Sequence, residues 1–126
     1  RITLSQLFAE SDEPASPLSR RAEQPIWRDP ASGYQRRNVS PAATGSAVDI
    51  VEIEFPPGAS VAFANDRVAG EDQHVWALDG VLELDLGGEA VRLEPGDCFF
   101  MRFGKPIQFR NPSPRPIRYA VILSRT

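Results

Sequence analysis

The 126-residue sequence contains only one cysteine, one histidine and one methionine. The single cysteine, Cys98, excludes an intrachain disulfide, and with only His74 beside it the usual zinc sites of nitrogen and sulfur ligands are excluded as well. This cysteine usage favours a reducing, cytoplasmic setting. Because the only methionine is Met101, we expect that a segment upstream of Arg1 has been removed from the gene product.

The sequence also lacks an excess of positive charge and any long hydrophobic run. It has 14 basic and 17 acidic residues, a net charge of -3, which gives no general attraction to nucleic acids or anionic membranes. No apolar stretch approaches the roughly 20 residues of a membrane-spanning helix, and no signal-peptide pattern opens the chain. We therefore expect no membrane association and no nucleic-acid binding by this chain itself.

Glycine and proline, in contrast, are plentiful, with 9 and 12 residues. They separate short runs in which apolar and polar residues alternate, as at residues 48–55 and 82–86, and this period of two is typical of half-buried strands. Gly87 and Gly88 fit the positive backbone angles of a tight hairpin. About eight or nine short strands with closely spaced turns predict a single all-β domain, a sandwich or barrel. The absence of intervening helices excludes a parallel α/β architecture.

The first 24 residues differ from the rest of the chain. Ile2, Leu4, Leu7 and Phe8 share one helical face and predict a short helix over residues 1–10. Residues 11–24 are small, polar and proline-broken, as in a linker. A helix this short is marginal alone, so we expect it to end a preceding helical domain or to pack on the β-domain, unless it is a disordered end. The β-barrel domain is expected over residues 25–126.

From Glu52 to Leu123, the order of strands and turns resembles the cupin family of small jelly-roll barrels. The first cupin motif is usually a glycine, two histidines, a glutamate and a second glycine. Here Gly58 opens the segment and residues 73–80 resemble its end, with Gln73 in the glutamate position. The second motif is matched by Gly96 and Asp97, by Gly104 and by Asn111, while Ile107 stands where its histidine would be. The resemblance implies an all-β, cupin-type jelly-roll barrel.

The whole chain more narrowly resembles the C-terminal part of bacterial regulators that join an XRE-type helix-turn-helix domain to a cupin domain. Residues 2–10 resemble the last helix of the DNA-binding unit, and a proline-rich linker follows. The resemblance implies an effector-sensing domain in a homodimer, which reaches DNA only through the full-length protein.

The sequence does not predict a metal or another cofactor. A divalent metal needs three or four converging ligands, but the two histidine positions of the first motif fall on Asp66 and Val68 or on Arg67 and Ala69. His74 is one residue out of phase with Gln73 and should point to the opposite face of its strand. A metal held by Asp66, Glu71 and Gln73 is the alternative.

No other catalytic group is predicted. Cys98 has no plausible base in its own motif, so we expect a buried strand thiol rather than a nucleophile. A serine-based triad would depend on the same misplaced His74. We therefore expect no enzymatic activity.

What remains is a barrel whose interior can bind a small organic molecule without reacting. Strand phase predicts an interior lined by Gln73, Val75, Ala77, Ile107, Phe109 and Asn111. Candidates for the mouth are Trp27, Tyr34, Arg36, Arg37, Asn65, Arg67, Arg102 and Gln108. Of both groups, the residues predicted to bind ligand are Trp27, Arg37, Arg67, Gln73, Val75, Ile107 and Phe109. Ordinary packing or a solvated arginine is the alternative for each.

The residues after Asp97 include basic side chains and no acidic ones. The basic residues are Arg102, Lys105, Arg110, Arg115, Arg118 and Arg125. They predict a positive rim that would favour an anionic effector. The alternative is cross-strand pairing with Glu52, Glu54, Glu83 or Asp85.

Three functions are compatible with these observations. The first is a non-catalytic sensor that binds a small metabolite and changes the DNA affinity of the full-length regulator. The second is a small cupin enzyme of the isomerase or oxygenase type, acting on a sugar or amino-acid derivative. The third is a structural dimerisation module with a solidly packed interior. A bound metal, together with acid and base groups in the interior, would support the enzyme. An interior that no ligand can enter would support the dimerisation module.

Overall fold

The computed structural model describes residues 16–63, 71–102 and 106–125. Within these ranges the chain forms strands and one short 3-10 helix, η1. The elements are η1 (Arg21–Glu23), β1 (Ile26–Arg28), β2 (Gln35–Asn38), β3 (Val48–Phe55), β4 (Ser60–Phe63), β5 (Glu71–Asp79), β6 (Leu82–Leu86), β7 (Glu89–Leu93), β8 (Cys98–Arg102), β9 (Ile107–Arg110) and β10 (Ile117–Arg125).

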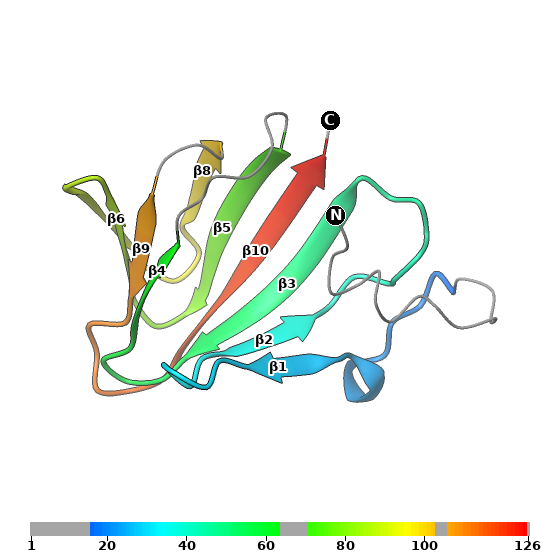
Figure 1. Cartoon of the computed structure of the whole chain (residues 1–126), viewed down its shortest axis with the longest axis horizontal. Helices are drawn as coiled ribbons and strands as arrows, with labels where there is room; N and C mark the ends of the chain where they lie inside the picture. The colour runs from blue at the N-terminus through cyan, green and yellow to red at the C-terminus, as the bar shows by residue number, and fades with distance from the viewer. Residues whose placement is uncertain (1–15, 64–70, 103–105, 126) are drawn as a thin grey trace.

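The strands form two antiparallel sheets, as Figure 1 shows. The larger has the order β1-β2-β3-β10-β5-β8 and the smaller the order β4-β9-β6-β7. The last strand, β10, lies between β3 and β5 over its whole length, so the order in space departs from the order in sequence. These crossovers between two sheets are those of a jelly roll, and the predicted all-β class is confirmed.

Alternation along the strands places the core between the sheets. On β3 the side chains of Val51, Ile53 and Phe55 are buried, whereas Glu52 and Glu54 lie on the other face. The other strands contribute inward residues in the same way, and aromatic rings join the two sheets. Phe109 of β9, for example, stacks on Tyr119 of β10 with ring centroids 5.5 Å apart.

Two turns depend on glycine. Leu86 is the register partner of Glu89, so Gly87 and Gly88 form a two-residue hairpin, with φ of 65° and 96°. This confirms the predicted tight turn between β6 and β7. Gly80, between β5 and β6, has φ of 80°, and a Cβ there would overlap Cγ2 of Ile117 and lie 3.1 Å from its Cβ. The glycine is needed both for its backbone angle and for the close approach of β10.

Two features differ from the sequence-based expectations. Strand β4 was not predicted, because only Val61 and Phe63 alternate there with the small residues Ser60 and Ala62. The end of the predicted linker is attached to the barrel, since Gln24 Nε2 donates hydrogen bonds to Ser19 O at 3.2 Å and to Val39 O at 3.3 Å. The predicted helix over residues 1–10 lies outside the described residues. In the part that is described, no helix has the length and apolar character needed to cross a membrane.

Candidate functional site

The inner face of β2 carries polar side chains into the core. Arg36 is the register partner of Ile53, and Asn38 that of Val51, and both partners are buried. Since register partners share a face of the sheet, Arg36 and Asn38 point toward the interior. Their neighbour Arg37 is paired with Glu52 and points outward.

Arg36 belongs to a row of side chains that crosses five strands. The register pairs Trp27 of β1 with Arg36, Arg36 with Ile53, Ile53 with Tyr119 of β10, and Tyr119 with Ala77 of β5. Trp27 is 43% exposed and Tyr119 is 2% exposed. The row therefore leads from the open edge of the inner face into the core.

Two donor atoms on β2 have no acceptor. Arg36 Nε and Asn38 Nδ2 are buried, and neither has a hydrogen-bond partner among the residues that the structure describes. Asn38 is buried as a whole, whereas Arg36 is half-buried. A buried donor without an acceptor costs about 1 to 3 kcal/mol, so the free protein is less stable than it would be with these donors satisfied.

The phenol groups of Tyr34 and Tyr119 lie within electrostatic reach of Arg36. Burial raises the pKa of Tyr34, and it raises the pKa of Tyr119 well above its ordinary value of 10.0. The positive charge of Arg36 acts on both in the opposite direction and lowers each pKa. One guanidinium thus lies near two buried tyrosine rings.

Four of the predicted binding residues lie on the inner faces. Val75 is completely buried, Gln73 is 7% exposed, and Ile107 and Phe109 are each 3% exposed. Their inward direction is confirmed, and their contact with a ligand stays a prediction. Gln73 lies two register rows away from the row of Tyr119, so it does not join Arg36 in one polar cluster.

The residues predicted at the mouth are divided between the two faces. Trp27 lies on the inner face and contacts the ring of Tyr34 edge-on, with centroids 5.7 Å apart. Arg37 does not line the interior, because its Nη1 donates a hydrogen bond to Arg21 O at 3.1 Å on the outside. Its neighbour Arg36 takes the inward position instead. Arg67 and Asn65 lie outside the described residues.

Two further mouth candidates point outward. Arg102 pairs with Asp72, with an Nε to Oδ1 distance of 3.3 Å, and Gln108 Nε2 donates to Ser60 Oγ at 2.6 Å. Both lie on outer faces, because each is next to a buried, inward-pointing residue of its own strand.

Asn111 has a structural role rather than the predicted place in a ligand cavity. It is fully buried, and its Nδ2 donates to Phe55 O at 3.3 Å, Pro56 O at 3.0 Å and Arg115 O at 2.7 Å. Its Oδ1 accepts hydrogen bonds from Ser113 N and Oγ. These hydrogen bonds join the end of β3 to the loop before β10 and occupy both polar atoms of the side chain.

The residues at the expected metal positions do not fit a divalent metal. Gln73 and Ile107 take the inner positions, and His74 is exposed on the outer face, where its ring lies 5.1 Å from that of Phe100. The described ranges contain no group of three or more His, Cys, Asp or Glu side chains that could hold a metal ion. Asp66, which belongs to the alternative ligand set, lies outside those ranges.

The expectation that Cys98 is buried is wrong. Its thiol is exposed, on the outer face of β8, where its register partner Trp76 is 46% exposed. The run of apolar residues from Cys98 to Met101 has no polar alternation that would have fixed its phase.

The predicted positive rim is also wrong, because most of the basic residues after Asp97 are paired with carboxylates. Besides the Arg102 pair, Arg110 Nε lies 3.1 Å from Glu83 Oε1 and Arg118 Nη1 lies 3.5 Å from Glu52 Oε2. Arg125 similarly pairs with Asp49. The alternative of cross-strand pairing is observed for these four arginines, with Glu52 and Glu83 as expected and with Asp72 and Asp49 in addition.

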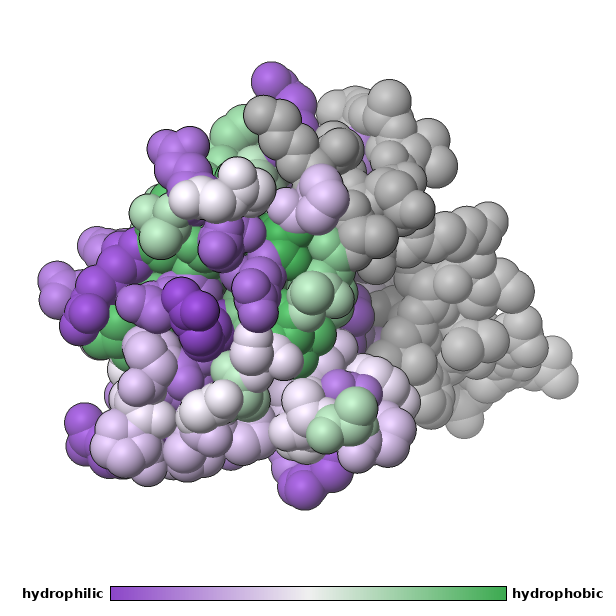
Figure 2. Space-filling view, turned by 60° about the vertical axis from the view of Figure 1, so that its left-hand side comes forward, coloured by the Kyte–Doolittle hydropathy of each residue, from purple (hydrophilic) through white to green (hydrophobic). Residues whose placement is uncertain are grey.

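The outer faces of the two sheets differ in character. The smaller sheet carries the Arg110–Glu83 pair and the Gln108–Ser60 hydrogen bond, and Figure 2, which brings this side forward, shows hydrophilic residues between smaller hydrophobic areas. The larger sheet instead exposes apolar side chains. Phe100, His74, Ile122 and Ile50 form one register row across β8, β5, β10 and β3, and Trp76 lies next to it.

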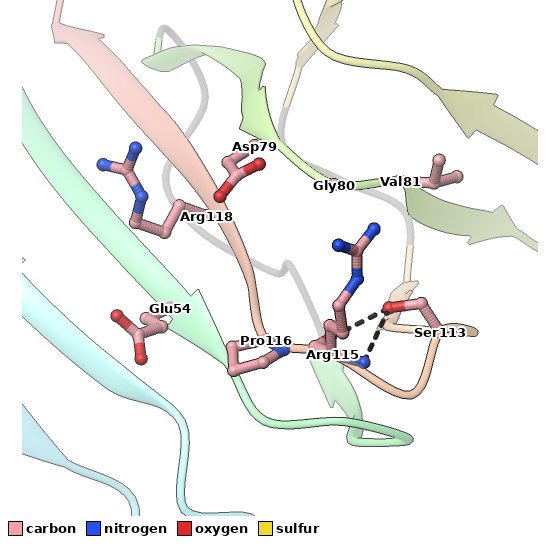
Figure 3. A pocket seen from close by; sticks show the side chains of 8 residues that line it. All are labelled: Glu54, Asp79, Gly80, Val81, Ser113, Arg115, Pro116 and Arg118. Atoms are coloured by element: carbon pink, nitrogen blue, oxygen red, sulfur yellow. Dashed lines mark hydrogen bonds between the residues drawn. The ribbon is translucent and has the colours of Figure 1, made fainter.

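A surface groove of about 450 Å³ lies outside the barrel, below the turn between β5 and β6. Its lining residues are Glu54, Asp79, Gly80, Val81, Ser113, Arg115, Pro116 and Arg118. Figure 3 shows carboxylates and guanidinium groups around it. The Ser113 hydroxyl group donates a hydrogen bond to Arg115 O and accepts one from Arg115 N. The groove contains none of the predicted binding residues.

The fold belongs to a known class. Residues 51–123, more than half of the chain, match the Cupin_2 family, the cupin domain. The chain therefore belongs to the Cupin_2 family. Strands β1 and β2, which carry Trp27, Arg36 and Asn38, precede the matched region.

Among solved structures, the chain is similar to the Cupin_2 domain of an XRE family transcriptional regulator from Enterobacter cloacae. The two are 26% identical with a TM-score of 0.68, over 74% of this chain and 97% of the other. KdgF from Halomonas sp. is 24% identical with a TM-score of 0.65, over 84% and 90% of the two chains. A sugar phosphate isomerase from Silicibacter pomeroyi is 23% identical with a TM-score of 0.61, over 75% and 60%. No functionally curated protein matches the sequence.

Proposed function

We propose that this cupin domain is the non-catalytic, small-molecule sensor of a bacterial transcriptional regulator. The observation that carries the proposal is the inner face of β2, where Arg36 Nε and Asn38 Nδ2 are buried with no acceptor in the described part of the chain. Such donors suit reversible binding, because a ligand that supplies an acceptor removes their cost. The likeness to an XRE family regulator's cupin domain supports the regulatory setting.

The proposal assigns DNA binding to a helix-turn-helix domain upstream of Arg1. The ligand would change DNA affinity by favouring one of two arrangements of the full-length regulator. A mobility-shift assay tests this division of labour. The present chain should bind no DNA specifically, the longer gene product should bind its own promoter region, and equal specific affinity of the two would contradict the proposal.

The enzyme alternative has weaker support. The likeness to a sugar phosphate isomerase is at 23% identity and concerns the fold alone. The residues at the family's metal positions, Gln73 and Ile107, supply no strong ligand, and Cys98 is exposed on an outer face. We therefore favour binding over catalysis.

We further propose that the sensor is a homodimer joined through the outer face of the larger sheet. Trp76 and Phe100 are 46% and 43% exposed there, and Ile50 is 36% exposed. The ion pairs Asp72–Arg102 and Glu52–Arg118 flank this apolar row and are each neutral, so a second copy of the same face can stack on it without net repulsion.

Sedimentation equilibrium tests the dimer. The parent chain should be dimeric, and Trp76→Arg should be monomeric, because two arginines would be buried face to face. Ala90→Arg, which adds the same charge to exposed β7 of the smaller sheet, should remain dimeric. A parent chain that stays monomeric at the highest protein concentration measured would overturn this interface.

A further inference from the structure

Among the described residues, no carboxylate lies in the register row of Arg36 or in that of Asn38. Glu52 and Glu54, the nearest carboxylates on β3, alternate with Ile53 and lie on the outer face. The side chain of Arg36 forms no ion pair or hydrogen bond with any residue in the described ranges. Arg102, Arg110 and Arg118, in contrast, each have a carboxylate partner.

As far as the chain is described, the facing sheet offers no inward side-chain acceptor either. Its buried inward residues are Leu82, Leu84, Leu93, Ile107 and Phe109, all of them apolar. Arg36 Nε and Asn38 Nδ2 therefore lie in apolar surroundings, where a polar group without a hydrogen-bond partner is costly. An acceptor that carries a negative charge would satisfy these donors and also pair with the charge of Arg36.

The two donors are placed to share one ligand group. Arg36 and Asn38 are two residues apart on the same strand face, about 6.6 Å along the backbone, and their side chains can close this distance. Trp27 is the register partner of Arg36, and the ring of Tyr34 lies 5.7 Å from that of Trp27 and 5.4 Å from that of Phe55 between centroids. Trp27 remains 43% exposed, so this end of the inner face is open to solvent.

We propose that Arg36, assisted by Asn38, binds the carboxylate of a small organic anion whose apolar body lies against Trp27 and Tyr34. The inference rests on the proposed sensor function and names its ligand class. A single guanidinium matches a monoanion, whereas a phosphate dianion would leave one negative charge uncompensated among apolar residues. Guanidinium and carboxylate are also matched in geometry, since both are planar and can form paired hydrogen bonds.

Benzoate is a suitable probe, with benzamide as its neutral analogue and inorganic phosphate as the competing anion. The chain has two tryptophans, so Trp76→Phe leaves Trp27 as the sole tryptophan reporter. In this parent, benzoate should change the fluorescence saturably and shift the Arg36 Nε–H resonance. Benzamide and phosphate should bind at least tenfold more weakly.

Two variants in the same background form a matched pair. Arg36→Gln should weaken benzoate binding at least tenfold, and Arg37→Gln, one residue away on the outer face, should leave it unchanged. Equal binding by the Arg36 variant, equal binding of benzamide, tighter binding of phosphate, or no saturable response to benzoate would each overturn the assignment.

A stability measurement separates binding from a structural role. Because Arg36 Nε has no partner in the free protein, Arg36→Leu should melt at the same temperature as the parent or higher, and benzoate should raise the melting temperature of the parent alone. A clear drop for Arg36→Leu would mean a structural arginine. None of these measurements involves DNA, so failure of the anion site and failure of the regulatory function are observed independently.

Discussion

At the scale of single residues, Ile107 tests the packing of the interior. It is 3% exposed and takes the position of a family histidine, so Ile107→Ala should remove buried methyl groups and lower the free energy of unfolding by about 2 to 5 kcal/mol. Urea denaturation gives this difference. Ile26→Ala, the same deletion at a residue that is 52% exposed and lies outside the proposed dimer contact, is the control and should cost clearly less. Equal costs would mean that Ile107 is not a core residue.

Tyr119 predicts a loss of stability at alkaline pH. Burial holds its pKa in the folded state well above 10.0, so above that pH the unfolded chain releases a proton that the folded chain keeps. The stabilising contribution is complete below about pH 10 and is lost as the pH rises toward the folded-state pKa. In Tyr119→Phe the unfolding free energy between pH 8.5 and 11 should fall less steeply, by up to about 1.4 kcal/mol per pH unit. An unchanged slope would contradict the prediction.

The sequence predicts which face a side chain occupies on some strands but not on others. Gln73, Val75 and Phe109 alternate with polar or exposed neighbours, and their inward phase followed from the period of two. On β2, however, Gln35 to Asn38 are all polar, so alternation gives no phase. The sequence therefore could not choose between Arg36 and Arg37, and only the register with β3 does.

At the scale of elements, the turn between β5 and β6 depends on Gly80. Gly80→Ala should destabilise the fold strongly, because the new Cβ would overlap Ile117 and the backbone angle is strained for any residue but glycine. Gly45→Ala is a matched control, with the same φ of 80° and no atom within 4 Å of the added Cβ. The difference between the two unfolding free energies measures the overlap alone. Similar losses would mean that the overlap is relieved by a shift of β10.

Strand prediction succeeded where alternation was regular, as on β3 and β6, and failed on β4. Ser60 and Ala62 give β4 little polar contrast, and the strand is four residues long. Its pairing with β9 is a long-range contact that local pattern does not record.

At the scale of the whole molecule, the chain should be stable without a transition metal. The purified protein should contain less than one equivalent of zinc, iron, nickel or manganese, and a chelator should not lower its melting temperature, because a metal bound only by the native state would stabilise it. Elemental analysis and thermal unfolding check this. A stoichiometric metal would mean that residues outside the described ranges, Asp66 first, complete a site.

Strand β2 carries neighbouring arginines on its two opposite faces. Arg36 faces the interior, while Arg37 on the other side holds the backbone of Arg21, and Gln24 is bonded to Val39 just beyond the strand. Neighbouring residues of a strand are only about 3.3 Å apart and joined by a stiff backbone. A shift of the β2 backbone at Arg36 would therefore also move Arg37 and its hydrogen bond to Arg21 O. The four-residue strand β2 thus connects the inner face of the sheet to residues 21–24 at the start of the barrel domain.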